Sequence, residues 1–326
     1  MFEFLINKLK AHPRRIVFTE GTDARILEAA ARLLSGNFLT PVLVGNPEEV
    51  MAAAEKAGFN IRGAEIIDPA NFDDMDKMVD EMVALRKGKM TADECRATLL
   101  QANYFGTMLV KMGYADALLG GATYSTADTV RPALQLVKTK PQNKIVSSCF
   151  IMVRPSATGS NEVLAMGDCA INIKPNEDEL VEIALETAKT AKTFGIDPKV
   201  AFLSYSTKGS GKGEDVDKVR NACAKAKQLA PELALDGEMQ FDAAVSPHVG
   251  QLKFPGSPVA GHANTFIFPD INAGNIGYKI AQRLGNFDAY GPILQGLNAP
   301  INDLSRGCNA LEVYSMAIIT AALWED

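Results

Sequence analysis

The most constraining feature of the chain is the alternation of short apolar runs with helical segments in its N-terminal half. Each run has strand length, is bounded by turn residues and precedes a segment with helical periodicity. Strands and helices that alternate at this spacing form a parallel sheet covered on both faces. The expected strands are 15–19, 41–45, 64–68 and 115–121, and the expected helices are 1–10, 24–34, 47–57, 75–86, a long helix over 91–112, and one that begins after Ser125.

The pattern changes after residue 143, where apolar runs follow one another without an intervening helix. We expect these consecutive strands, at 144–153, 163–167 and 169–173, to pair antiparallel. Farther along, helices are predicted at 176–194, 213–230 and 274–284, and strands at 199–205 and 263–269. Glycine and proline cluster in 285–300, which we interpret as the crossing that returns the chain to its first domain. The last helix should therefore pack on that domain.

The length of 326 residues exceeds the size at which a single core usually stops growing, and 47% hydrophobic residues can fill two cores. We therefore predict two three-layer α/β domains. The first is discontinuous and comprises residues 1–147 and 299–326, and the second comprises residues 148–298. By the rule for open α/β sheets, ligands lie beyond the carboxyl ends of the strands, where residues 19–23 and 120–125 are expected.

The charge and the cysteines exclude several classes of protein. A formal net charge of -6 argues against a general nucleic-acid or anionic-membrane surface. The N-terminal segment has no long apolar run, so neither a signal peptide nor a membrane span fits. Five widely spaced cysteines without a C-x-x-C motif indicate reduced thiols in a cytoplasmic protein. The three histidines lack metal-ligand spacing, so no metal site is expected.

A loop that runs into a helix near the C-terminus combines turn and capping residues. Asn302 and Asp303 can close a tight turn through their side chains, and Gly307 can adopt a positive φ. Asn309 is placed to cap the final helix. The loop therefore predicts a tight turn with free backbone N–H groups at a helix N-terminus.

This turn also carries the residues for an anion site with a possible base. Ser305 supplies a hydroxyl and Arg306 a permanent cation suited to bidentate phosphate binding. Glu312 supplies a carboxylate, but it follows Asn309 by three residues, which is the spacing of a capping pair. On spacing alone the capping interpretation is favoured. Residue patterns thus indicate a two-domain α/β enzyme with an anionic ligand.

A second glycine-rich segment, residues 206–213, lies between an expected strand and helix. It fails the P-loop pattern, because Ser206 stands at the first glycine position and Gly213 at the hydroxyl position. It also fails the dinucleotide pattern, which disfavours NAD binding. Two interpretations remain open: an anion cradle in which Thr207 and Lys208 contact the ligand, or a plain mobile connection.

The segment 300–308 resembles the phosphate acetyltransferase (phosphotransacetylase) family, and the likeness extends over essentially the whole chain. It includes the segments 131–135, 204–211 and 266–279. The resemblance implies reversible acetyl transfer between acetyl phosphate and coenzyme A, with acetyl-CoA and inorganic phosphate as products. It also implies a homodimer whose two α/β domains surround a cleft, in the fold superfamily of isocitrate and isopropylmalate dehydrogenases. Coenzyme A is then a substrate, and no cofactor is expected.

The resemblance assigns roles to individual residues. The catalytic serine and arginine of the family fall on Ser305 and Arg306. The family's usual base, an aspartate, falls on Glu312, which keeps the carboxylate on a longer arm. The residues implicated in coenzyme A binding fall on Arg86, Arg131, Lys279 and Arg283.

The expected mechanism is direct attack of the coenzyme A thiolate on the acetyl carbonyl in a ternary complex. Glu312 assists deprotonation, Arg306 neutralises the phosphate, and Ser305 donates a hydrogen bond. A phosphate butyryltransferase with a larger acyl pocket is the alternative. A non-catalytic coenzyme A-binding module fits poorly with the complete Ser-Arg-Gly turn. An NAD-dependent dehydrogenase of the same superfamily needs a nucleotide fingerprint and metal-binding carboxylates that the sequence lacks.

Overall fold

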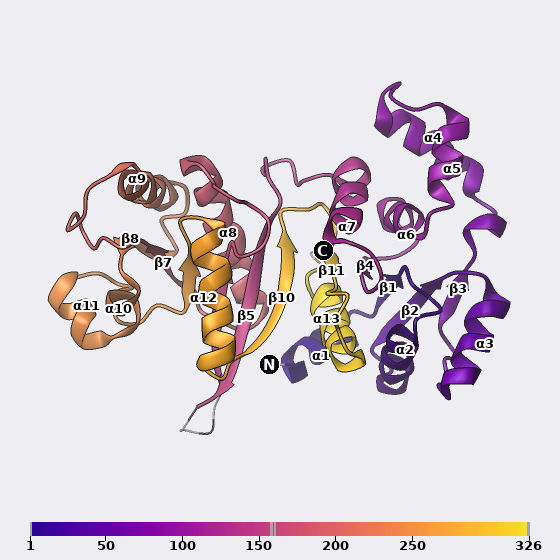
Figure 1. Cartoon of the computed structure of the whole chain (residues 1–326), viewed down its shortest axis with the longest axis horizontal. Coiled ribbons are helices and arrows are strands. Elements are labelled where there is room, and N and C mark those ends of the chain that lie inside the picture. The colour runs from indigo at the N-terminus through magenta and orange to yellow at the C-terminus, as the bar shows by residue number, and fades with distance from the viewer. Residues whose placement is uncertain (1, 157–158, 160, 325–326) are drawn as a thin grey trace. The chain divides into compact units, whose positions relative to one another are not determined.

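The structure is a computed structural model that describes residues 2–156, 159 and 161–324. It divides into two compact units (Figure 1). The terminal unit comprises Phe2–Lys140 and Leu297–Asp326, and the central unit comprises Pro141–Gly296. Among the described residues, no helix has the length and apolar character needed to cross a membrane.

The sheet of the terminal unit is wholly parallel, as the alternating pattern predicts, with strand order β11-β4-β1-β2-β3. Its strands are β1 (Arg14–Phe18), β2 (Leu39–Val44), β3 (Glu65–Ile67), β4 (Ala117–Gly120) and β11 (Ile301–Asp303). The central strands β1 and β4 are apolar and buried throughout their paired residues. Burial on both faces explains why they appear as continuous apolar runs rather than alternating ones.

The helices of the terminal unit pack around this sheet, and most lie where the sequence predicts them. They are α1 (Phe2–Ala11), α2 (Ala24–Gly36), α3 (Pro47–Ala57), α4 (Met75–Arg86), α5 (Ala92–Leu99), α6 (Ala102–Lys111), α7 (Thr126–Pro132) and α13 (Ala310–Ala322), with short helical turns at η1 (Pro69–Asn71) and η2 (Ala133–Val137). The last helix, α13, packs on α1, α2 and β4.

The long helix predicted over residues 91–112 is wrong, because α5 and α6 are separate helices. The predicted capping box at Thr91 and Glu94 is present. However, Gln101 has an extended backbone (φ -80, ψ 127), and α6 begins after it. The two helices pack on different partners: α5 lies against α4, whereas α6 lies against β1 and β4. Tertiary packing therefore divides a segment whose local sequence is helical throughout.

The central unit contains a six-stranded mixed sheet in the order β10-β5-β6-β9-β7-β8. Its strands are β5 (Ser147–Pro155), β6 (Asn161–Gly167), β7 (Lys199–Leu203), β8 (Ala234–Met239), β9 (Thr265–Ile267) and β10 (Asp288–Gln295), and its helices are α8 (Glu177–Thr193), α9 (Glu214–Leu229), α10 (Phe241–Val245), α11 (Pro247–Lys253) and α12 (Ile271–Leu284). Neighbouring residues Phe266 and Ile267 enter separate core clusters on opposite faces. The predicted antiparallel pairing of β5 with β6 is confirmed.

Two predictions for this unit are wrong. Residues 169–173 form a turn and not a strand. The amides of Ala170, Ile171 and Asn172 donate to the Asp168 carboxylate at 3.0, 3.2 and 3.0 Å instead of to a neighbouring strand.

Residues 285–300 are not only a connection, since they contain β10, an edge strand antiparallel to β5. The pairing register shifts between Tyr290 and Ile293, and an edge strand tolerates proline there. Strand β8 and the short helices α10 and α11 were not predicted.

Candidate active site

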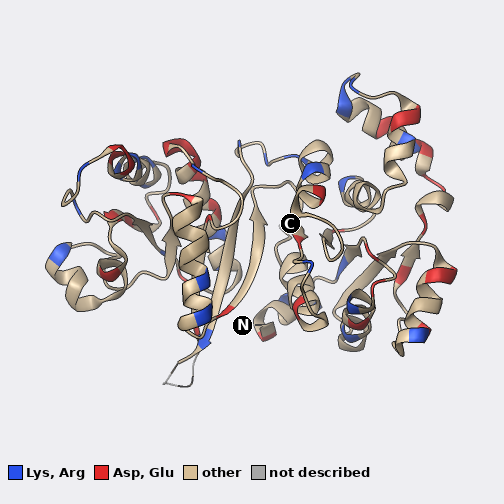
Figure 2. Cartoon of the chain, in the orientation of Figure 1, with Lys and Arg blue, Asp and Glu red and all other residues tan. Residues whose placement is uncertain are grey.

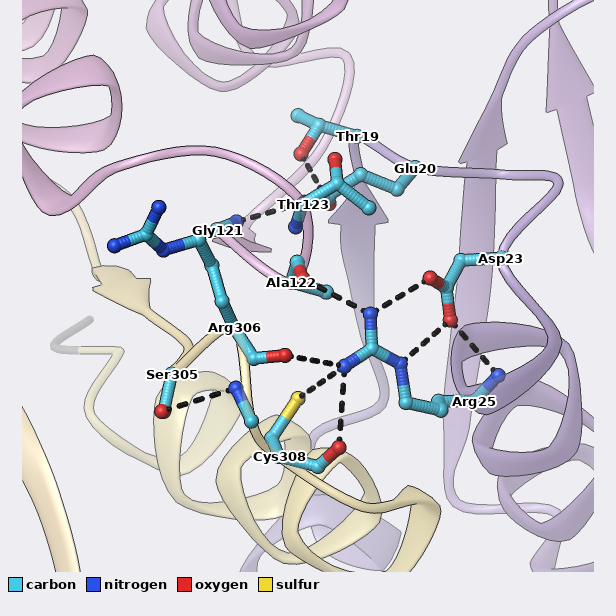
Figure 3. Close-up of polar contacts among 11 residues, drawn as sticks. Thr19, Glu20, Asp23, Arg25, Gly121, Ala122, Thr123, Ser305, Arg306 and Cys308 are labelled. Carbon is cyan, nitrogen blue, oxygen red and sulfur yellow. Dashed lines mark hydrogen bonds and ion pairs between the residues drawn. The ribbon is translucent and has the colours of Figure 1, made fainter.

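Three adjacent strands of the terminal unit bring their carboxyl ends to one edge of the sheet. The strands β11, β4 and β1 are neighbours and run parallel, so the segments that follow them meet. These segments are residues 304–309, 121–125 and 19–23 (Figure 3). The prediction that residues 19–23 and 120–125 lie at strand ends is confirmed. The structure adds the predicted Ser305–Arg306 pair to the same edge.

Arg25, in the first turn of α2, bonds to all three segments (Figure 3). Its Nε and Nη2 donate to the Asp23 carboxylate at 3.0 and 2.8 Å. Its Nη2 also donates to the Ala122 carbonyl at 2.9 Å, and its Nη1 donates to the carbonyls of Arg306 and Cys308 at 2.9 and 3.2 Å. Asp23 caps α2 through the Arg25 amide. Sequence reasoning missed this arginine, because its partners in the other two segments are 97 to 283 residues away along the chain.

Glu20 is the second residue at this edge that sequence reasoning missed. Its Oε1 accepts hydrogen bonds from the amides of Gly121 and Thr123 at 3.0 and 3.2 Å, and its Oε2 accepts one from the Thr19 hydroxyl at 2.8 Å. Burial raises the pKa of Glu20, and these hydrogen bonds oppose the rise. The carboxylate therefore ties the end of β1 to the segment that follows β4.

The expected tight turn closed by Asn302 and Asp303 is wrong, because both residues lie on the buried strand β11. Asn302 donates from its side-chain amide to Thr320 of α13 at 2.9 Å. The Asp303 carboxylate accepts from the hydroxyls of Thr126 and Thr129 at 2.5 and 2.6 Å, and its burial raises its pKa. Both side chains hold β11 in place, and the turn begins only after them.

The turn itself exposes Ser305 and Arg306. The Cys308 amide donates to the Ser305 carbonyl at 2.9 Å, and the Gly307 amide donates to the Ser305 Oγ at 3.2 Å. The expected positive φ of Gly307 is wrong, since this residue is not among the glycines with that conformation. In the part of the chain described here, the Arg306 guanidinium makes no hydrogen bond or ion pair, and Figure 3 shows it pointing away from Arg25.

Glu312 forms the capping pair that its spacing indicates. The Asn309 side chain accepts from the Glu312 amide at 2.9 Å, and the Glu312 Oε2 accepts from the Asn309 amide at 2.9 Å. The predicted Asn309 cap is therefore confirmed. The Glu312 side chain remains exposed, so the cap leaves one carboxylate oxygen accessible from solvent. Its assignment as a base stays a prediction.

The two arginines predicted to bind coenzyme A in this unit lie on separate helices. Arg131, in α7, is exposed and lies 3.8 Å from the Asp128 carboxylate. Arg86 ends α4, and its Nε is buried without a hydrogen-bond partner among the described residues. Arg131 therefore belongs to the helix that follows the 121–125 segment, whereas Arg86 belongs to the α4–α5 helices.

The glycine-rich loop of the central unit is folded around a buried carboxylate, Glu238. Its Oε1 accepts from the Gly209 amide and from the Ser206 hydroxyl, each at 2.8 Å. The Lys208 amide donates to the Glu238 carbonyl at 3.2 Å, and the Gly211 amide donates to the Ser206 Oγ at 2.8 Å. These three amides therefore have partners within the central unit, and the anion cradle stays a prediction.

The side chains of Thr207 and Lys208 also have partners within the central unit. The Thr207 hydroxyl is within 3.2 Å of the Gln240 side-chain oxygen and accepts from the Gln240 amide at 3.0 Å. The Lys208 ammonium lies 5.0 Å from the centre of the Phe254 ring. Of these two predicted ligands, the Lys208 side chain is exposed and the Thr207 side chain is buried.

The remaining predicted ligands, Lys279 and Arg283, are exposed and lie one helical turn apart on α12. Figure 2 shows basic residues toward the C-terminal end of this helix. Lys279 donates to the Asn275 side chain at 2.8 Å. Within the described residues, no group of three or more His, Cys, Asp or Glu side chains is placed to hold a metal ion.

Comparison with known proteins decides the family. Residues 1–321 match the family model described as phosphate acetyl/butaryl transferase. The chain belongs to this family. The resemblance that the Ser-Arg-Gly turn indicates is thereby confirmed, and the chain is an acyltransferase by family.

Relatives of this acyltransferase match over nearly the full length. A phosphate acetyltransferase from Bacillus subtilis is 53% identical, and the match covers 99% of this chain and 98% of the relative. The crystal structure of a phosphotransacetylase from Streptococcus pyogenes is 55% identical, has a TM-score of 0.95 and is matched over 98% of this chain and 97% of that chain.

A more distant structure shows the fold alone. A protein from Salmonella typhimurium assigned as a 4-hydroxythreonine-4-phosphate dehydrogenase is 12% identical with a TM-score of 0.53, over 95% of this chain and 99% of that chain. The acyltransferase therefore shares its two-unit α/β architecture with a dehydrogenase-like fold, as the sequence resemblance implies.

Proposed function

We propose that this acyltransferase transfers an acetyl group reversibly between acetyl phosphate and coenzyme A. The observation that carries the proposal is the exposed Ser305–Arg306 pair, whose guanidinium has no partner among the described residues. It lies at the carboxyl edge of a parallel sheet, where open α/β sheets bind ligands. Family membership supports the same chemistry.

Arg306 is the proposed ligand of the phosphate group. A guanidinium is permanently charged and presents a planar fork that matches two phosphate oxygens. When the bond between the acetyl carbon and the bridging oxygen breaks, the negative charge on the departing phosphate grows. An arginine that faces this charge stabilises the transition state more than the ground state, and this difference is what accelerates the reaction.

Ser305 orients the attacking thiol or the developing oxyanion through its hydroxyl. Its Oγ accepts from the Gly307 amide, which leaves its own proton free to donate. The thiolate sulfur forms the new bond to the acetyl carbon, and inorganic phosphate leaves with the electron pair of the broken bond. We propose direct transfer without an acetyl-enzyme. Stoichiometric acetylation of Ser305 or ping-pong kinetics would contradict it.

Glu312 is the proposed acceptor of the thiol proton. The pKa of a free thiol is about 8.5, so a base must help to form the thiolate at neutral pH. One Glu312 oxygen accepts the capping hydrogen bond from Asn309. The exposed carboxylate can serve as cap and base together, because a carboxylate has two oxygens with several acceptor positions.

Coenzyme A is proposed to act as a substrate rather than a cofactor, and the candidates for binding it are basic side chains and one threonine. In the terminal unit the candidates are Arg86 and Arg131. In the central unit they are Thr207, Lys208, Lys279 and Arg283. Exposure supports Arg131, Lys279 and Arg283 in this role, since an anionic ligand can reach them from solvent.

We also propose a cytoplasmic homodimer. The five cysteines are free thiols, which suits a reducing compartment such as the cytoplasm.

The proposed dimer rests on an exposed apolar stripe on α12. Its residues Ile276, Ile280 and Leu284 recur every four residues and are 58%, 53% and 80% exposed. Such an apolar stripe is typical of an interface between copies. Sedimentation should show a dimer, and Ile280→Glu should shift it toward a monomer.

The activity is tested by thioester absorbance with coenzyme A and either acetyl phosphate or butyryl phosphate. The proposal predicts the higher kcat/KM with acetyl phosphate, and a preference for butyryl phosphate would favour the family's other activity. Reduction of NAD is the control for a dehydrogenase. Absence of thioester with both acyl phosphates would overturn the proposed function.

A further inference from the structure

Arg25 lies beside the Ser305–Cys308 turn, yet its side chain has no N–H group left for a substrate. A guanidinium has five N–H donors. Nε bonds to Asp23, Nη2 bonds to Asp23 and Ala122, and Nη1 bonds to the carbonyls of Arg306 and Cys308. Every donor is therefore engaged by the protein itself. In this respect Arg25 is the opposite of Arg306, whose guanidinium has no partner among the described residues.

The bonds of Arg25 cross between segments that are distant in sequence. The carbonyls of Arg306 and Cys308 are 281 and 283 residues away along the chain, and the Ala122 carbonyl is 97 residues away. Asp23 holds the guanidinium from the other side through a bidentate ion pair, with side-chain exposures of 28% for Arg25 and 16% for Asp23. One partly buried pair thus joins the start of α2 to both loops of the site.

The turn has few other bonds that could set its direction. Besides Arg25, its backbone is held by the Leu304 amide on the Gly120 carbonyl at 2.7 Å and by the two hydrogen bonds to Ser305. The Arg306 carbonyl faces Arg25, and its side chain projects away from it (Figure 3). Rotation of this peptide would therefore redirect the guanidinium of Arg306.

We propose that Arg25, anchored by Asp23, is a positioning residue that holds the carbonyls of Arg306 and Cys308 so that Ser305 and Arg306 face the substrate. The inference rests on the proposed function for its catalytic consequence. Lysine cannot replace this arginine, because a single ammonium cannot reach carbonyl groups on both loops and a carboxylate in the geometry of a planar fork.

The first test compares Arg25→Ala and Arg25→Lys with Arg32→Ala, which removes an exposed arginine paired with Glu28 on the same helix. Misplacement of a catalytic group by about 1 Å can cost about 10²-fold in rate. Both Arg25 variants should lose about that factor in kcat, with a much smaller change in either KM. Added guanidinium, at concentrations that leave the wild type folded, should restore part of the rate to Arg25→Ala but not to Arg32→Ala.

The second test is independent of catalysis and measures alkylation of Cys308 by mass spectrometry. Burial raises the pKa of the Cys308 thiol, and Arg25 lowers it. Loss of charge alone would therefore slow alkylation in Arg25→Ala. The Arg25 Nη1 also lies 3.7 Å from the Cys308 Sγ, so truncation in Arg25→Ala uncovers the thiol directly. Arg25→Lys keeps a long cationic side chain there, and a loosened turn should accelerate alkylation of the otherwise buried thiol in that variant. Cys95, buried in the same unit, should label at the wild-type rate and so reports any general unfolding.

Faster Cys308 labelling in Arg25→Lys with unchanged Cys95 labelling supports the positioning role, even if the wild type proves inactive with acetyl phosphate. Unchanged or slower Cys308 labelling in Arg25→Lys would overturn it. A selective rise in one KM with normal kcat would also overturn it, because that result identifies Arg25 as a substrate ligand. If Arg25→Ala fails to fold, Arg25→Lys carries both measurements.

Discussion

Two glycine-containing loops of this acyltransferase, the 206–211 loop and the Ser305–Cys308 turn, have similar compositions but opposite electrostatic arrangements. In the 206–211 loop, an internal anion, Glu238, accepts from the loop's N–H and hydroxyl groups. In the turn, an internal cation, Arg25, donates to the loop's carbonyl groups. In the 206–211 loop, N–H and hydroxyl donors that an anionic ligand would need are therefore already hydrogen-bonded to Glu238. In the turn, only carbonyl acceptors are bonded to Arg25, and the guanidinium of Arg306 stays available.

This difference shows that glycine and hydroxyl residues in a loop do not by themselves leave backbone N–H groups free for an anion. What matters is whether the protein already satisfies the donors. A buried amide without a partner costs free energy, so a loop that folds in the absence of ligand commonly satisfies its own N–H groups. The Ser305–Arg306 turn does not carry the free-energy cost of an unpaired buried donor, because its charge is on the exposed side chain of Arg306, where water can solvate it.

The largest expected effect is the loss of the turn's free cation. Arg306→Ala should reduce kcat by about 10² to 10³, because it removes a charged donor from the leaving phosphate. Lys208→Ala removes the cation of the other loop and should cost far less in kcat. Steady-state kinetics with both substrates measures the contrast, and equal losses in the two variants would break the comparison.

Glu312→Gln should have the next largest effect, about 10²-fold in kcat, if its carboxylate is the base. Glutamine still accepts the Asn309 hydrogen bond, so the midpoint of thermal unfolding should stay close to that of the wild type. Glu312→Ala, the matched variant, removes base and cap together and should also lower stability by roughly 1 kcal/mol. Normal turnover in Glu312→Gln would leave this residue with the capping role alone.

Glu238→Gln should act on stability rather than directly on chemistry. The amide retains one oxygen for the Gly209 and Ser206 donors, but it lacks the negative charge that strengthens both hydrogen bonds, which should cost about 1–3 kcal/mol of unfolding free energy. Urea denaturation measures this loss. The control is Glu232→Gln, at an exposed residue of the same unit, which should be neutral. Equal stability of both variants would show that the 206–211 loop does not depend on its internal anion.

Arg131→Ala should have the smallest effect, a several-fold rise in KM for coenzyme A with little change in KM for acetyl phosphate. Arg131 is exposed and has only a long ion pair to Asp128, so its removal should not disturb α7. Competition with desulfo-coenzyme A offers an independent measure of affinity. The reverse KM pattern would reassign Arg131 to the acetyl phosphate site.

Local sequence predicted most regular elements, because their signals lie within a few residues. The capping pair of Asn309 and Glu312 and the capping box at Thr91 both appear as predicted. Failures occurred where distant contacts override local preference. Residues 285–300 contain glycine and proline, yet β10 forms there because β5 offers an edge for pairing. Asp303 has a turn-forming side chain, yet β11 places it beneath α7.

The parallel α/β pattern, the family and the presence of a serine and an arginine in one turn all follow from the sequence. These features depend on residue order and short-range periodicity. Which charged and polar groups remain available to a ligand depends on the folded structure, because Arg25 and Glu238 reach the two loops from other parts of the chain. A guanidinium whose five N–H groups all donate within the protein has none left for a ligand, and local sequence does not show contacts between distant segments.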